Sequence, residues 1–203
     1  MPLKNWKLTF ILGIALMVFS YLYLDRPLAL YFQDLNPSTR QVVKLIGQIA
    51  LPIPHVLLWV VVYYILRFRL KLIPMARKAI LFAISINIAN VITTILKNGI
   101  GRSRPEIFLS QKIYTFKMLS FPLSNLYVSF PSSHAATICA LTAGLACFYP
   151  RFSSLFLLLG FLIGFCRVVI DVHYLSDVIG GMLIGVLVAN SVYLAMRKEV
   201  KFD

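Results

Sequence analysis

The sequence predicts an all-α integral membrane protein with six transmembrane helices and catalytic motifs at one membrane face. Of its 203 residues, 60% are hydrophobic and only 13% are charged, which is too apolar for a soluble domain of this size. Six apolar segments each approach the roughly 20 residues that a helix needs to cross a bilayer. Polar motifs lie beside the ends of several of these segments, and these motifs predict the catalytic face.

The six predicted spans take up most of the chain. They are residues 8–24, 49–66, 79–96, 135–149, 152–166 and 178–196. We expect the first span to remain uncleaved, because the sequence YLYLDRP after it offers no small-residue cleavage site. No linker, repeat or low-complexity tail separates the spans, so residues 1–203 are predicted to form a single domain.

Residues 25–48, between the first two spans, mix apolar and polar positions. Pro37 and Ser38 resemble a helix start, and Val42 and Ile46 follow at helical spacing. This pattern predicts an amphipathic segment in the outer membrane interface.

Small and polar residues inside the spans predict helix packing. We expect the third span to form interhelical hydrogen bonds through its polar side chains, and the sequences GFLIG (160–164) and GMLIG (181–185) to bring the fifth and sixth helices close together. The polar side chains of the third span are Ser85, Asn87, Asn90, Thr93 and Thr94.

The formal net charge of +13 indicates membrane orientation and an anionic substrate, and not nucleic acid. By alternation of the spans, eleven Lys and Arg residues fall on the side of the termini and nine on the other side. Three of those nine belong to the motifs described below. The imbalance predicts cytoplasmic termini in the inner membrane, with the motifs facing the periplasm or exterior.

Three polar motifs flank the spans. KNGIGRSRP (97–105) follows the third span, PSSH (131–134) opens the fourth, and CRVVIDVHYLSD (166–177) joins the fifth to the sixth. Because successive spans reverse direction, both connections lie on the same membrane face, whichever way the termini point. We therefore predict that the three motifs converge on one pocket, with residues 97–134 as a catalytic loop.

The residue types in these motifs are those of phosphoryl transfer. Arginine forks match phosphate oxygens, a helix start favours an anion, and two histidines supply a nucleophile or base and an acid. His173 and Asp177 share a helix face, whereas Asp171 should point elsewhere. No carboxylate or cysteine cluster resembles a metal site, so we expect neither metal nor other cofactor. The candidate residues are Lys97, Arg104, Arg167, Ser132, Ser133, His134, His173 and Asp177.

These motifs resemble the three signatures of the type 2 phosphatidic acid phosphatase superfamily, whose membrane branch also has six helices. The family pattern is K, six residues, RP; then PSGH; then SR, five residues, H, three residues, D. Nine of its eleven fixed letters occur here in order and spacing. The departures are Ser133 in place of glycine and Cys166 in place of serine.

The resemblance implies a role for each matching position. His173 would attack phosphorus and become phosphohistidine, Asp177 would hold the other ring nitrogen, and His134 would protonate the leaving lipid oxygen. The phosphate would be bound by Lys97, Arg104, Arg167, the Ser132 hydroxyl and the Ser133 amide. Arg102, Lys112 and Lys117 fall outside the signatures and are expected to face lipid headgroups, with a second substrate phosphate as the alternative.

The predicted function is metal-independent hydrolysis of phosphate from a membrane lipid phosphate or diphosphate. The basic 102–117 loop favours a substrate with more than one phosphate, such as undecaprenyl diphosphate. Lipid A, phosphatidylglycerophosphate and a lipid phosphotransferase reaction remain as alternatives. A transporter is the non-enzymatic alternative, and it is disfavoured because the ionisable groups lie at one face instead of at mid-depth.

Overall fold

The structure, a computed structural model, describes residues 5–118 and 124–199. Within these ranges the only β-type pairing is one bridge between Arg102 and Phe116, and the regular structure is helical. The six longest helices are α1 (Trp6–Phe19), α4 (Pro52–Tyr64), α5 (Ile73–Ile100), α7 (Ser133–Phe148), α8 (Ser153–Val169) and α9 (Leu175–Glu199). The shorter ones are α2 (Asp25–Phe32), α3 (Pro37–Gln48) and α6 (Pro105–Gln111).

Two π-helical segments and two 3-10 turns complete the secondary structure of the described residues. The π segment Ser20–Leu24 joins α1 to α2, and Ile65–Arg69 extends α4. The 3-10 turns are Asn125–Tyr127 and Pro150–Phe152.

Five stretches of the described chain are long and apolar enough to cross a membrane. They are Trp6–Phe32, Pro37–Arg69, Ile73–Ile100, Pro150–Val169 and Leu175–Arg197. The fourth predicted span corresponds to α7, which is apolar but has only 16 residues. The prediction of an all-helical, multi-pass membrane protein is confirmed at this level.

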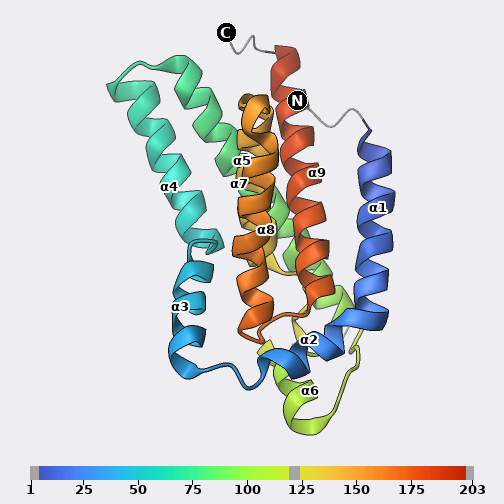
Figure 1. Cartoon of the computed structure of the whole chain (residues 1–203). Coiled ribbons are helices and arrows are strands. Elements are labelled where there is room, and N and C mark those ends of the chain that lie inside the picture. Colours follow the sequence, from blue (N-terminus) through green and yellow to red (C-terminus); the bar gives the residue numbers. More distant parts are fainter. Residues whose placement is uncertain (1–4, 119–123, 200–203) are drawn as a thin grey trace.

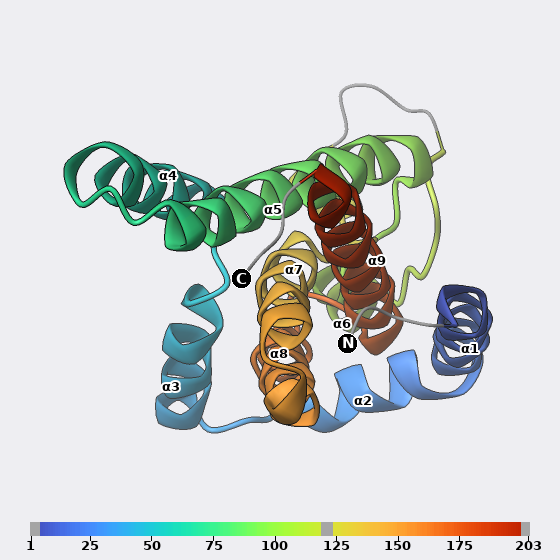
Figure 2. The same ribbon diagram turned by 90° about the horizontal axis from the view of Figure 1, so that it is seen from above.

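The long helices run side by side, and α7 lies among α5, α8 and α9 (Figures 1 and 2). At the upper end of Figure 1 lie the start of α1, the α4–α5 turn and the end of α9. The lower end carries α2, α3, α6 and the connection from α8 to α9, with α2 lying across the bundle. The two motif-bearing connections therefore share one end of the bundle, as the alternation of the spans predicts.

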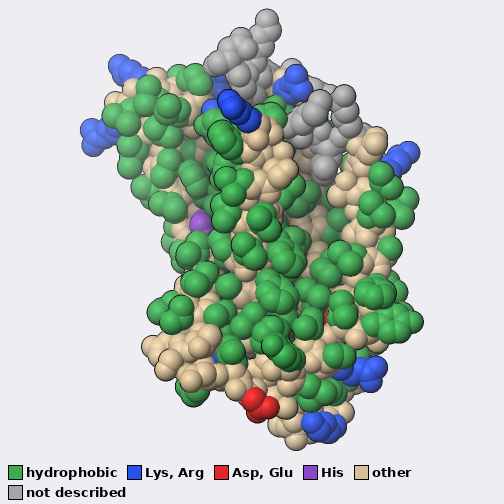
Figure 3. Space-filling model, in the orientation of Figure 1, with side chains coloured by type: hydrophobic (Ala, Val, Ile, Leu, Met, Phe, Trp, Pro, Cys, Tyr) green, Lys and Arg blue, Asp and Glu red, His purple; other side chains and the backbone are tan. Residues whose placement is uncertain are grey.

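Hydrophobic side chains cover the middle of the molecule, whereas Lys and Arg side chains gather toward its ends (Figure 3). Helix α1 buries none of its residues, and Leu12 and Ile95 each expose more than half of their surface. Large exposed apolar patches are rare on soluble monomers. Such a surface fits the hydrocarbon interior of a bilayer.

Close contact between α7 and α9 depends on two glycines of α9. A Cβ atom added at Gly181 or Gly185 would collide with backbone atoms of α7, at Ser132 and Ala136 respectively. Gly160 of α8 likewise faces α7, at Thr142. The two glycine patches therefore pack mainly on α7, although Gly164 also faces Val178 of α9. The close packing of the fifth and sixth helices that the sequence predicts is thus only partly seen, because α7 packs against both helices.

Two of the five polar side chains predicted to form interhelical bonds, Asn90 and Thr93, join α5 to α7, whereas the buried Ser85 hydroxyl has no hydrogen-bond partner within the described chain. The Asn90 side-chain amide donates to the Thr137 hydroxyl at 2.9 Å, and the Thr93 and Ser133 hydroxyls lie 3.0 Å apart. The helix start at Pro37 is also confirmed, because the Asn36 side chain accepts a hydrogen bond from the Ser38 amide at 2.9 Å.

Candidate active site

A glycine turn at the end of α5 directs the first motif into the site. Gly101 has a φ of +61°, in the left-handed region, and its amide donates to the Lys97 carbonyl at 2.9 Å. A Cβ atom there would collide with the Lys117 carbonyl. A glycine therefore fits both the backbone conformation and the space at this position. The turn sends Arg102 inward and places Arg104 at the start of α6.

The second motif is fixed directly to the start of α9. Ser132 is the N-cap of α7, and its hydroxyl accepts from the Ala135 amide at 3.4 Å. Its own amide donates to the Asp177 carbonyl at 3.0 Å. His134 consequently lies in the first turn of α7, at the end of the bundle that also carries His173.

A compact turn between α8 and α9 positions the third motif. The amides of Val172 and His173 both donate to the Arg167 carbonyl at 3.1 Å. Asp171 has a φ of +55°, and its carboxylate accepts from Arg40 at 3.1 Å. The partner of Asp171 in the described chain is thus Arg40, and the helix that the sequence places under Asp171 and His173 begins only at Leu175.

His173 and Asp177 are buried together, with exposed fractions of 3% and 0%. Nδ1 of His173 lies 3.6 Å from Oδ2 of Asp177, which is longer than a hydrogen bond, so the expected direct bond is not formed. Oδ2 instead accepts from the Ser129 hydroxyl at 2.6 Å and the Tyr174 amide at 2.8 Å. Because Nδ1 faces the carboxylate, Nε2 is the ring nitrogen left for a substrate.

The environment keeps the His173 ring neutral. Burial lowers the pKa of His173 to about 3, and the nearby Asp177 opposes this shift without reversing it. A neutral imidazole is the form that can act as a nucleophile.

Three cations lie near His134, and two of them also near His173. The positive charges of Arg167, Lys97 and Arg104 all act on His134, and those of Lys97 and Arg104 also act on His173. Burial lowers the pKa of Arg104 below its ordinary value. Partly buried cations that face one another repel, and an anion placed among them would relieve that repulsion.

Backbone carbonyl groups orient two of these cations. The Lys97 ammonium donates to the Val128 carbonyl at 2.7 Å, and Nε of Arg104 donates to the Asn125 carbonyl at 2.7 Å. Nε of Arg167 is buried and has no hydrogen-bond partner within the described chain. These contacts leave part of the donor capacity of the cations for a ligand.

The two departures from the family signatures are accommodated within the protein. Ser133 begins α7 in a helical conformation and pairs with Thr93, so this position does not need the backbone freedom of glycine. The Cys166 thiol donates to the Leu162 carbonyl one turn earlier, at 3.4 Å.

Comparison with known proteins decides the family. Residues 78–201, more than half of the chain, match the PAP2 superfamily. The chain belongs to the PAP2 superfamily. The resemblance predicted from the three motifs is thereby confirmed.

Curated relatives of this PAP2 chain include the lipid A 1-phosphatases of Rhizobium johnstonii and Rhizobium etli. Each is 34% identical over 97 residues, which is 48% of this chain. The match covers 39% and 41% of their lengths, so the chain spans about two fifths of these relatives.

Two solved structures share the fold. The PAP2-type phosphatidylglycerolphosphate phosphatase from Bacillus subtilis has a TM-score of 0.66 at 18% identity, covering 100% of this chain and 98% of that one. Aquifex aeolicus LpxE has a TM-score of 0.60 at 23% identity, covering 82% and 92%. At these identities the likeness establishes the fold alone.

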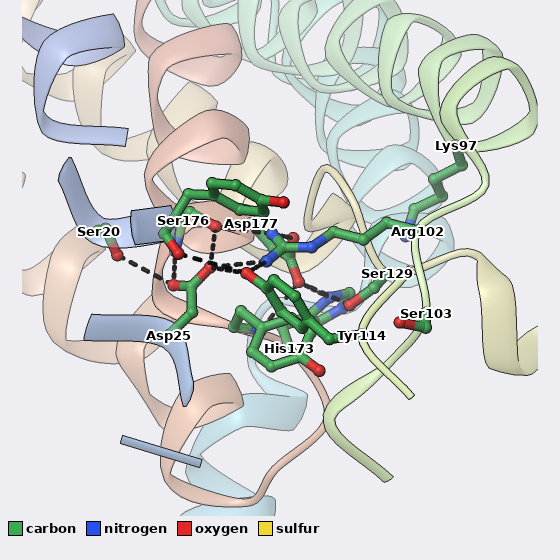
Figure 4. Close-up of polar contacts among 12 residues, drawn as sticks. Ser20, Asp25, Lys97, Arg102, Ser103, Tyr114, Ser129, His173, Ser176 and Asp177 are labelled. Atoms are coloured by element: carbon green, nitrogen blue, oxygen red, sulfur yellow. Dashed lines mark hydrogen bonds and ion pairs between the residues drawn. The ribbon is translucent and has the colours of Figure 1, made fainter. Parts of the chain in front are cut away.

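Arg102 corrects one expectation from the sequence, because it does not face lipid headgroups. Its side chain is 2% exposed and lies between two carboxylates, 2.5 Å from Asp177 and 2.6 Å from Asp25 (Figure 4). Burial alone would lower the pKa of Arg102, but Asp177 and Asp25 raise it above its ordinary value. Lys112 and Lys117, which the sequence also places outside the signatures, are exposed as expected.

Asp25 corrects a second expectation, because it is only 1% exposed although it begins the predicted interfacial segment 25–48. It also lies outside residues 78–201, the part of this PAP2 chain that matches the family. The chain has only seven acidic residues, and Asp25 directly follows an apolar span. A carboxylate in that position is the signal that would have identified it, since charges beside a span are costly unless they are paired.

Proposed function

We propose that this protein is an integral-membrane lipid phosphatase that transfers a phosphoryl group from a lipid to water through a phosphohistidine. The observation that carries the proposal is that three cations act on His134, and two of them also on His173, at one end of an apolar helical bundle. Cations that position a phosphate, a neutral nucleophile and a second histidine are the groups this reaction requires.

In the proposed reaction, Nε2 of His173 attacks phosphorus, and a P–N bond forms as the P–O bond to the lipid breaks. His134 supplies the proton that the departing lipid oxygen takes up. Water then attacks the phosphohistidine and gives a proton to His134, the P–N bond breaks, and inorganic phosphate leaves. Asp177 offsets the positive charge on the phosphorylated ring.

Phosphate binding is assigned to the cations and to the start of α7. Lys97, Arg104 and Arg167 would neutralise the phosphate oxygens, with the Ser132 hydroxyl and the Ser133 amide as further donors at the helix N-terminus. Because three cations already offset the phosphate charge, the reaction is proposed to need no metal ion.

The membrane placement follows from charge and length. We propose one domain over residues 1–203 with six spans, of which α7 is the fourth and the shortest. Residues 25–48 would form an interfacial segment, and residues 97–134 a catalytic segment. The excess of Lys and Arg at the opposite end supports cytoplasmic termini. The site would then face the periplasmic side of the inner membrane.

The proposed substrate class is a membrane lipid that carries a phosphate, and two observations bear on its identity. The burial of Arg102 removes one charge from the basic loop that favoured a diphosphate such as undecaprenyl diphosphate. The curated relatives are lipid A 1-phosphatases. We therefore place lipid A 1-phosphate first, ahead of undecaprenyl diphosphate and phosphatidylglycerophosphate.

Phosphate release by the purified protein from these three lipids, in detergent with excess chelator, tests the proposal. We expect release from lipid A at the 1-position, no requirement for magnesium and no release by His173→Gln. A phosphorylated acceptor lipid in place of free phosphate would indicate a phosphotransferase. If none of the lipids loses phosphate and reconstituted vesicles take up a solute, the transporter alternative replaces the enzyme.

A further inference from the structure

A buried cluster of three charged groups lies directly behind His173 (Figure 4). Nη1 of Arg102 contacts Oδ1 of Asp177 at 2.5 Å, and Nη2 contacts Oδ2 of Asp25 at 2.6 Å. The side chains of all three residues are at most 2% exposed. Asp177 therefore belongs to an Asp25–Arg102–Asp177 cluster, in which it is the residue that faces His173.

The charge of this cluster depends on Asp25. Asp177 and Arg102 alone carry no net charge, so the cation of Arg102 weakens the attraction between the Asp177 carboxylate and the positive charge of a phosphorylated imidazole. The second carboxylate, from Asp25, gives the cluster a net charge of −1. In a buried, low-dielectric site, a difference of one charge changes interaction energies strongly.

Different donors bind the two carboxylate oxygens of Asp177. Oδ2 of Asp177, which faces His173, is fixed by Ser129 and the Tyr174 amide, whereas Oδ1 is bound by Arg102. Removing Arg102 thus leaves the oxygen nearest His173 in place.

Asp25 has a full set of donors besides Arg102. Its Oδ1 accepts from the Ser20 hydroxyl at 3.0 Å and the Ser176 amide at 2.9 Å. Its Oδ2 accepts from the Ser176 hydroxyl at 2.5 Å and the Tyr114 hydroxyl at 3.2 Å. These bonds anchor the junction of α1 and α2 to the first turn of α9.

We propose that Asp25 is a positioning residue that acts through Arg102. It gives the Asp25–Arg102–Asp177 cluster beside His173 the net negative charge that stabilises the phosphohistidine. The inference rests on the proposed function. It assigns a role in the reaction to the α1–α2 segment, which lies outside the residues that match the family.

Three variants test the charge argument in detergent, with the lipid phosphate that wild type cleaves best and at matched amounts of folded protein. Asp25→Asn keeps the size of the side chain but makes the cluster neutral. We expect a loss of at least about tenfold in kcat with KM within about twofold of wild type. Asp25→Glu keeps the charge and should retain more activity than Asp25→Asn. Asp34→Asn is the control, because Asp34 is exposed and lies in the same N-terminal region.

The double variant Asp25→Asn/Arg102→Gln separates a charge effect from a structural one. It restores a net charge of −1 by leaving Asp177 as the only charged member, while Gln retains a donor. We expect the kcat of the double variant to be at least about threefold higher than that of Asp25→Asn, although the double variant removes one more native side chain. A purely structural role for Asp25 predicts a double variant that is slower than the single one.

The proposal is overturned by near-wild-type kcat in Asp25→Asn, by a loss confined to KM, or by a folded double variant no faster than the single variant. If the double variant does not fold, equal losses in Asp25→Glu and Asp25→Asn would overturn it instead. These outcomes are distinguishable from failure of the proposed function. If the proposed function were wrong, phosphate release by the wild-type protein would not depend on His173.

Discussion

At the residue scale, the carboxylate of Asp177 accepts hydrogen bonds on both oxygens. Arg102 binds one oxygen, while Ser129 and the Tyr174 amide bind the other. The His173 ring lies 3.6 Å away, so Asp177 affects it through its charge and its fixed position. Asp171, only two residues from His173, is instead paired with Arg40.

This difference predicts unequal effects of the same change at the two aspartates. Asp177→Asn should lower kcat at least about a hundredfold, roughly 2.7 kcal/mol, with little change in KM. Asp171→Asn should be much milder, because Asp171 pairs with Arg40 and not with the ring. Both are to be compared on one lipid substrate at matched folded protein. A dead Asp171→Asn beside a nearly normal Asp177→Asn would refute this assignment.

The low pKa of His173 predicts that its ring does not take up a proton near neutral pH. Because burial lowers this pKa to about 3, the ring should remain neutral between pH 8 and 5 in the folded protein. An unfolded chain takes up this proton near pH 6.5. The group therefore makes folding less favourable as the pH falls below about 6.5 toward 3.

Histidine-selective ¹³C NMR in detergent measures that titration, with the resonance identified by its loss in His173→Gln. We expect the chemical shift to stay constant over this range. A midpoint near 6.5 would mean that the ring is not desolvated as the structure indicates.

Sequence alone predicts the motif residues but not the charge cluster behind them. The family spacing brings His134, His173 and the cations together because it fixes which helix ends carry them. Arg102 and Asp25 lie 77 positions apart, and no local pattern pairs them. A sequence shows that an arginine lies beside a membrane span, but whether it faces water or a buried carboxylate depends on tertiary packing.

At the element scale, the close approach of α9 to α7 joins the second motif to the third. The Ser132 amide bonds to the Asp177 carbonyl where Gly181 faces the α7 backbone. The apolar runs predict that these helices exist. Hydropathy does not specify which helices are neighbours, so the sequence alone does not show that the glycine patches of α8 and α9 pack mainly on α7.

Gly181→Val should force the start of α7 away from α9. Overpacking of this kind typically costs about 1–3 kcal/mol, so we expect a lower thermal midpoint in detergent and a loss of activity. Gly99→Ala is the matched control, because a Cβ atom at Gly99 meets nothing within 4 Å. Unchanged stability and activity in Gly181→Val would show that this contact does not position the site.

At the scale of the whole molecule, the proposed orientation follows from the unequal distribution of Lys and Arg between its two ends. Lys112 is exposed at the end that holds the site, and Arg151 is exposed between α7 and α8 at the opposite end. In a background without the three native cysteines, Lys112→Cys should react with a membrane-impermeant maleimide from the periplasmic side. Arg151→Cys should react only after the inner membrane is opened, and the reverse pattern would invert the proposed orientation.

The most direct test of the account is to trap the phosphoenzyme. The purified protein would be mixed for milliseconds with a lipid whose reactive phosphate carries ³²P, quenched in alkali and digested. Phosphohistidine is a phosphoramidate, so the label should be acid-labile and should map to the peptide that contains His173. It should be absent in His173→Gln. Label on another residue, or rapid hydrolysis by a folded His173→Gln variant, would contradict the proposal that His173 is the nucleophile.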